Sequence, residues 1–241
     1  MKIKSALFIL VAVFLLSGSA FATGFTNPCD TPDPPNVDLC VPYGTGLANV
    51  YTFTPKDPDM NDLDHAYPYY WGLDATSAIN NLGFVPSDII GAEITIKNIY
   101  DWQKEPNILW INLLDGRPTN FGSYTKDGTD VWVWKDNQYP TNRFASANVP
   151  NILIDQWTDV DGPQTHDNLT FTFDATEIAT LIAYIMNDNK FGIGVDPDCH
   201  YYNDGFKLKI YTECEVPEPG TLPLLLGSAL AGLAFLGSRR K

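Results

Sequence analysis

The feature that most constrains the fold is a series of short segments in which apolar and polar residues alternate. The alternation is clearest at residues 94–99 and 206–211, and Gly, Pro, Asn and Asp separate the segments. Because successive side chains of a strand point to opposite faces, this pattern predicts antiparallel strands with one buried and one wet face. The predicted strands are 49–54, 66–73, 89–100, 108–114, 129–134, 151–156, 168–174, 191–196 and 206–212.

One segment has helical spacing instead. Asp174 can cap a helix, and Glu177 three residues later completes a capping box. The apolar residues that follow share one helical face: Ile178, Leu181, Ile182 and Ile185. Many strands with one helix predict a mainly β, antiparallel two-sheet sandwich of jelly-roll type, with one α-helix and a C-terminal transmembrane helix.

The N-terminus has the three parts of a secretory signal peptide. Lys2 and Lys4 precede an apolar core at 6–16, and an A-x-A site ends at Ala22. We expect a signal peptide at 1–22, a Pro- and Asp-rich irregular leader at 23–46 and the sandwich domain at 47–215.

The C-terminus combines Val216-Pro217-Glu218-Pro219-Gly220, an uncharged run at 221–238 and the basic end Arg239-Arg240-Lys241. As a helix, the run would be about 27 Å long, which is close to one hydrocarbon core. These three parts resemble the PEP-CTERM sorting signal of bacterial exported proteins, here at 216–241. The resemblance implies processing by an exosortase-type membrane enzyme.

The localisation implied is export, with the C-terminal helix anchored in the inner membrane until processing. Delivery to the cell surface or extracellular matrix would follow, where exopolysaccharide or biofilm is the implied partner. Residues 189–205 also resemble a passage in the body domains of some PEP-CTERM proteins. This second resemblance supports the family assignment and the sandwich fold, but it implies no mechanism.

The body is strongly acidic. The chain has 15 Lys and Arg against 29 Asp and Glu, and five of the basic residues lie in the terminal signals. Nucleic acids and anionic headgroups need Lys and Arg to neutralise them, so the composition argues against both as partners. It favours divalent cations or uncharged partners such as glycans, with a merely solvating surface as the alternative.

Four cysteines lie in the exported body: Cys29, Cys40, Cys199 and Cys214. An even number in an oxidising compartment predicts two disulfides, for which three pairings exist. We expect Cys29–Cys40 and Cys199–Cys214, because each closes a short loop. A Cys₄ metal site is the alternative, although no C-x-x-C spacing supports it.

Acidic stretches are candidate calcium sites, calcium being the one cofactor that the sequence suggests. Residues 57–64 supply oxygens at alternate positions but depart from the helix-loop-helix pattern, with Asp62 where glycine is required and Pro68 where the bidentate Glu belongs. A second candidate group consists of Asp196, Asp198, Asn203 and Asp204. A third consists of Asp155, Asp159, Asp161 and Asp167. Ordinary acidic turns are the alternative for all three.

Aromatic residues are the candidate ligand-binding groups. Trp132 and Trp134 share one face of a predicted strand, and Tyr69 and Trp71 share a face of another. If exposed, either pair would form a flat platform for sugar rings, with Trp132 and Trp134 as our first choice. Packing inside the sandwich is the alternative.

Catalytic motifs are absent from the sequence. His65, His166 and His200 are its histidines, and neither H-E-x-x-H nor G-x-S-x-G occurs. His65 beside Asp64, and His200 beside Asp198, could each join a metal site. We expect a non-catalytic structural or carbohydrate-binding module, with a surface hydrolase acting on polysaccharide through paired carboxylates as the alternative.

Overall fold

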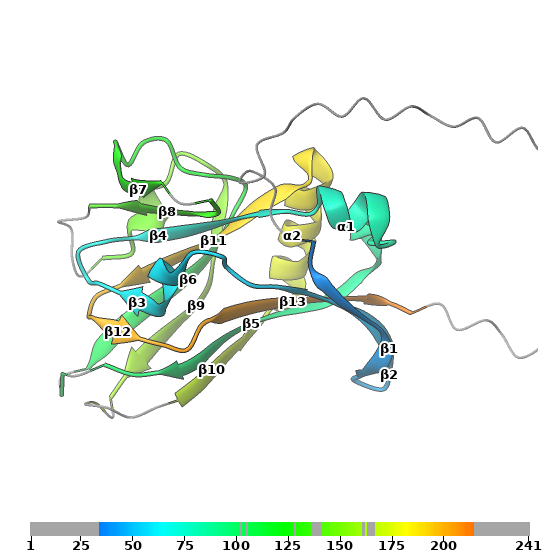
Figure 1. Ribbon diagram of the computed structural model, residues 1–241, viewed down its shortest axis with the longest axis horizontal. Helices are drawn as coiled ribbons and strands as arrows, with labels where there is room; N and C mark the ends of the chain where they lie inside the picture. The colour runs from blue at the N-terminus through cyan, green and yellow to red at the C-terminus, as the bar shows by residue number, and fades with distance from the viewer. Residues whose placement is uncertain are drawn as a thin grey trace, which may run out of the picture. The chain divides into compact units, whose positions relative to one another are not determined.

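The computed structural model describes residues 34–214, apart from 102, 105, 128, 136–140, 161 and 163–166 (Figure 1). The predicted signal peptide, residues 23–33 of the predicted leader and the sorting tail lie outside the described residues. Within the described part, the strands form three antiparallel sheets. The chain is therefore mainly β and sandwich-like, in agreement with the alternation of its sequence.

The first sheet has five strands in the order β1-β2-β13-β5-β10. Their bounds are β1 Asn36–Tyr43, β2 Gly46–Phe53, β13 Phe206–Glu213, β5 Ile89–Ile99 and β10 Asp167–Thr172. Its central strand, β13, is the last strand of the chain and pairs with β2 on one side and β5 on the other.

The second sheet has six strands in the order β7-β8-β4-β11-β6-β9. Their bounds are β7 Tyr124–Asp127, β8 Val131–Trp134, β4 Tyr69–Asp74, β11 Lys190–Pro197, β6 Asn107–Leu114 and β9 Asn151–Asp159. A third, two-stranded sheet pairs β12 Tyr201–Tyr202 with β3 Asp62–Leu63.

The main core consists of the inward-facing residues of both larger sheets. On β13, for example, Leu208 and Ile210 are fully buried in this core, whereas Lys207 and Lys209 face outward. All nine predicted strands are present, with ends that differ by a few residues. The period-two pattern predicted them because it reports which face of each strand is buried.

The predicted helix is confirmed as α2, Ala175–Asp188. The Asp174 side chain accepts from the N–H groups of Thr176 and Glu177, and the Glu177 carboxylate accepts from the Asp174 N–H. Asn189 ends the helix in the left-handed conformation, with φ 65°. Leu181 and Ile185 are fully buried in the main core.

The structure adds elements that the sequence reading did not include. A short helix α1 covers Thr76–Asn81, and 3-10 turns cover Pro58–Asn61, Arg143–Ser146 and Pro86–Asp88. Strand β1 lies inside the stretch that was predicted as an irregular leader, so the first sheet begins before residue 47. No helix in the described part of the chain is long and apolar enough to cross a membrane, and the predicted span at 221–238 lies outside that part.

The disulfide pairing differs from the predicted one. Cys40 on the edge strand β1 is bonded to Cys214, directly after β13, with a Cα–Cα distance of 5.4 Å. Both predicted local pairs, Cys29–Cys40 and Cys199–Cys214, are therefore wrong. The reason is tertiary: sheet formation brings the two ends of the described chain together, whereas Cys199 is buried elsewhere.

Candidate functional site

The two faces of β8 carry different side chains, as the alternation predicts. Val131 and Val133 are buried in the main core between the larger sheets. Trp132 and Trp134 point to the opposite face, where Trp134 belongs to a second buried cluster. The face assignment is therefore confirmed, but exposure to solvent has to be judged from what covers that face.

The loops after β6 and β8 cover this outer face. The ring of Phe121 lies edge-on to Trp134 at 5.4 Å, and Phe144 lies 5.5 Å from Phe121. The Arg117 guanidinium lies 5.2 Å from the ring centre of the half-buried Trp132. Trp134 is only 1% exposed. The prediction of an exposed aromatic platform at Trp132 and Trp134 is thus wrong, because distant loop residues cover it.

The second predicted platform is also buried. Tyr69 and Trp71 on β4 are 4% and 2% exposed and belong to the main core. The Tyr69 hydroxyl accepts from the Asp64 N–H at 2.9 Å and donates to the Asp62 carbonyl at 3.2 Å. Burial raises its pKa, so the hydroxyl stays protonated and holds the acidic turn against the sandwich.

The four predicted calcium ligands do not converge on one point. Each holds a different part of the chain by a hydrogen bond: Asp196 to the Arg143 N–H, Asp198 to the Ile108 N–H, Asn203 to the Met60 carbonyl and Asp204 to the Asn98 amide. Among the described residues, no group of three or more His, Cys, Asp and Glu could hold a metal ion. Each of these side chains forms a structural hydrogen bond, as the alternative of ordinary acidic turns expects, and calcium binding stays a prediction.

The two described histidines also have structural partners. His65 Nδ1 lies 3.2 Å from Asp64 Oδ1, and both side chains are largely exposed. His200 Nε2 contacts Asp62 rather than the predicted neighbour Asp198. The His200 ring stacks on Tyr202 at 4.8 Å. The contacts of His200 fasten the small β3–β12 sheet.

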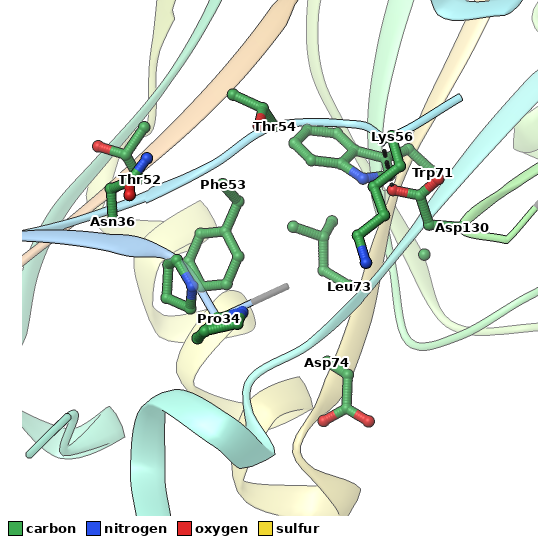
Figure 2. Close-up of a pocket in the computed structure, with 12 residues that line it drawn as sticks. Pro34, Asn36, Thr52, Phe53, Thr54, Lys56, Trp71, Leu73, Asp74 and Asp130 are labelled. Carbon is green, nitrogen blue, oxygen red and sulfur yellow. Dashed lines mark hydrogen bonds between the residues drawn. The ribbon is translucent and has the colours of Figure 1, made fainter. Parts of the chain in front are cut away.

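A cleft of about 430 Å³ lies between β2 and β4, which belong to different sheets (Figure 2). We call it the β2–β4 cleft. Phe53, Trp71 and Leu73 form its apolar floor, and all three are buried residues of the main core. The volume is in the range of small-molecule sites, which are largely apolar with a few placed polar groups.

The rim of the β2–β4 cleft is polar. Asn36 and Thr52 are directly opposite each other on β1 and β2, and Thr54 follows along the same chain segment. Asp74 lines the other wall, where its Oδ1 accepts from the Thr76 N–H at 2.8 Å. Figure 2 shows these side chains around the apolar floor, with Lys56 extending into the cleft. Hydroxyl, amide, ammonium and carboxylate groups therefore surround one apolar surface.

Asp130 is the most unusual group of this cleft. Asp130 directly precedes β8 and is only 5% exposed. Its Oδ2 accepts a hydrogen bond from the Lys56 N–H at 2.9 Å. Its own carbonyl accepts from the Gly72 N–H at 2.8 Å, which fixes the residue against β4. Burial raises the pKa of this carboxyl, and the Lys56 N–H opposes the rise. Asp130 therefore places a buried carboxyl group beside the apolar floor of the cleft.

Sequence reasoning did not identify Asn36, Thr52, Lys56 or Asp130 as site residues. They come from three separate stretches that meet when the sheets form, and their spacing in the chain carries no motif. Trp71 was named for a different reason, as part of an exposed platform. It contributes to the floor of the cleft instead.

Comparison with protein families identifies the C-terminus. Residues 215–241 match the family model described as the PEP-CTERM protein-sorting motif. The match covers the tail and not the body, and it confirms the resemblance that the tail residues suggest. It indicates an exported, membrane-transiting protein, and the motif implies processing by an exosortase-type enzyme. No curated protein matches the chain.

Proposed function

We propose that this chain is a surface or extracellular-matrix protein whose body binds neutral carbohydrate in the β2–β4 cleft without turning it over. In this proposal, the apolar run at 221–238 anchors the protein in the inner membrane until an exosortase-type enzyme processes the tail. Exopolysaccharide of the surrounding biofilm is then the ligand that the body meets.

The strand order supports a jelly roll as the finer fold class. With the edge strand β1 of the first sheet and the two outermost strands β7 and β8 of the second set aside, the orders are β2-β13-β5-β10 and β4-β11-β6-β9. They place consecutive strands largely in alternate sheets. Jelly rolls occur among lectin domains, but a fold by itself does not assign a function. The proposal therefore depends on the cleft.

The observation that carries the proposal is an apolar floor of Phe53, Trp71 and Leu73 within a rim of hydrogen-bonding side chains. A sugar ring has the same two kinds of surface, with C–H faces and a belt of hydroxyl groups. The net charge of −14 for the whole chain disfavours anionic ligands and is compatible with uncharged ones.

The test is binding of the purified exported protein to an array of neutral and anionic polysaccharides, with release of reducing ends measured in parallel. We expect retention of neutral polysaccharides with no release of reducing ends. Replacing Thr52 and Thr54 by valine should weaken retention, because it removes rim hydroxyls while keeping side-chain shape. A protein that retains no saccharide would overturn the proposal.

A surface hydrolase is the second candidate, and one observation favours it. Asp74 and Asp130 line the same cleft, and glycoside hydrolysis uses a pair of carboxylates. Release of reducing ends by the wild type, abolished by either Asp74→Asn or Asp130→Asn, would establish this candidate in place of the first. Unchanged background release in both variants would exclude it.

A further inference from the structure

The Asp130 carboxylate has one oxygen in use and one without a partner. Oδ2 accepts from the Lys56 N–H at 2.9 Å. Oδ1 is buried and has no hydrogen-bond partner within the part of the chain that the structure describes. A buried acceptor without a donor is unfavourable by about 1–3 kcal/mol, and more for a charged group. Such an atom at the wall of a cleft calls for a donor from outside the protein.

We propose that Asp130 determines the specificity of the β2–β4 cleft by accepting a hydrogen bond from a hydroxyl group of a neutral sugar. This proposal rests on the proposed function. It adds the ligand group that the cleft recognises, a hydroxyl, and the class of saccharide that it excludes, the uronic acids. An ionised carboxylate can only accept, so a sugar hydroxyl is a suitable partner. A uronic acid would instead bring its own carboxylate beside Asp74 and Asp130, where repulsion by two carboxylates outweighs attraction by the single Lys56 ammonium.

The Lys56 side chain lies in the same cleft as this carboxylate. Figure 2 shows the Lys56 side chain beginning beside the Asp130 carboxylate, where the backbone hydrogen bond is drawn, and extending along the cleft. Its side chain is exposed. An exposed lysine side chain can change rotamer within nanoseconds, so we expect a ring that enters the cleft to shift it. The backbone N–H of Lys56 stays on Oδ2 and keeps the carboxylate in place.

The position of Asp130 adds geometric selectivity. Its carbonyl is held by the Gly72 N–H and its Oδ2 by the Lys56 N–H, so main-chain groups from both walls of the cleft orient the carboxylate. A site built to bond a hydroxyl discriminates strongly against a ligand that lacks it, because the buried polar group is then left unpaired.

The test is calorimetric titration of the exported protein with neutral hexaoses of glucose, mannose and xylose, and with galacturonate and mannuronate hexamers. Asp130→Asn keeps an acceptor for the Lys56 N–H but turns an NH₂ donor toward the cleft. We expect at least a 10-fold loss of affinity for the neutral hexaose that the wild type binds. Asp196→Asn is the matched control, a buried aspartate outside the cleft, and should bind like the wild type.

The outcomes separate this inference from the proposed function. A folded Asp130→Asn variant that binds the neutral hexaose within twofold of the wild type would overturn the role of Asp130 and leave the cleft function standing. Uronate hexamers that bind the wild type as well as neutral ones would overturn the selectivity, and this measurement needs no variant. A wild type that binds no saccharide would instead refute the proposed function.

Discussion

At the scale of single residues, the outer face of the second sheet depends on glycines that make room for rings. A Cβ atom on Gly192 would lie 2.0 Å from a carbon of the Tyr70 ring, and one on Gly72 would lie 2.8 Å from the Trp132 ring. Tyr70 and Trp132 are themselves in contact, with ring centres 5.7 Å apart. The bare backbone of β4 and β11 therefore forms the surface on which this aromatic cluster packs.

Gly192→Ala should destabilise the protein by about 1–3 kcal/mol, because the buried Tyr70 ring must move to admit the methyl group. Gly46→Ala is the control, since a Cβ there meets nothing within 4 Å. Chemical denaturation measures both. Equal unfolding free energies for the two variants would contradict the packing described here.

The buried carboxyl of Asp130 should give stability a defined pH dependence. Burial raises its folded-state pKa above the ordinary 3.8, so the folded protein binds this proton more tightly than the unfolded chain. The contribution of this carboxyl to the unfolding free energy is fully present below about pH 3.8. It is lost as the pH rises through the raised folded-state pKa.

The difference in unfolding free energy between the wild type and Asp130→Asn should therefore fall as pH rises from 3 to 7. Urea titrations of both proteins across this range, without sugar, measure it. A difference that stays constant, or that grows with pH, would show that burial does not raise this pKa.

At the scale of elements, one disulfide joins the edge of the first sheet to its central strand. Between the two cysteines lies β2, whose Asn49 Oδ1 accepts from the Cys40 N–H at 3.2 Å while its Nδ2 donates to the Glu213 carbonyl at 3.1 Å. A bulge between Asp38 and Val41 on β1 places Cys40 for this contact. The bond closes a loop with a sequence separation of 174 residues.

Replacing both Cys40 and Cys214 by alanine should lower the unfolding free energy by about 2–5 kcal/mol, because the unfolded chain regains the freedom that the long loop removes. Calorimetry or denaturant titration measures the loss. Non-reducing peptide mapping of the wild type is the accompanying check. A linked peptide containing Cys40 and Cys199 would contradict the bond.

At the scale of the whole molecule, delivery and body are encoded in separate parts of the chain. The family match covers 215–241, and the last strand of the body, β13, ends at Glu213. The sorting signal therefore begins directly after the body's last strand and its disulfide. Changes confined to the tail should alter destination without altering the stability of the sandwich.

Replacing Pro217, Glu218 and Pro219 by alanine should leave unprocessed full-length protein in the inner membrane, because the motif read by the processing enzyme is lost. Cell fractionation followed by immunoblotting measures the product. Glu213→Ala, at an exposed position before the matched tail, is the control and should be processed normally. Release of the triple variant at the wild-type rate would mean that the motif is not read.

The sequence by itself determined the local features of this protein. Alternation predicted nine strands, including the opposite faces of Val131 and Trp132 on β8, because side-chain direction in a strand depends only on position. The capping box of Asp174 and Glu177 and the sorting motif are likewise short-range patterns.

The tertiary structure decided everything that depends on residues far apart in the chain. Trp134 is buried because Phe121 and Phe144 fold over it, and Cys40 meets Cys214 because the first and last strands of the described chain share a sheet. The β2–β4 cleft exists because separate segments of two sheets meet around Trp71. Spacing along a chain does not encode such contacts, since they arise only when the sheets pack together.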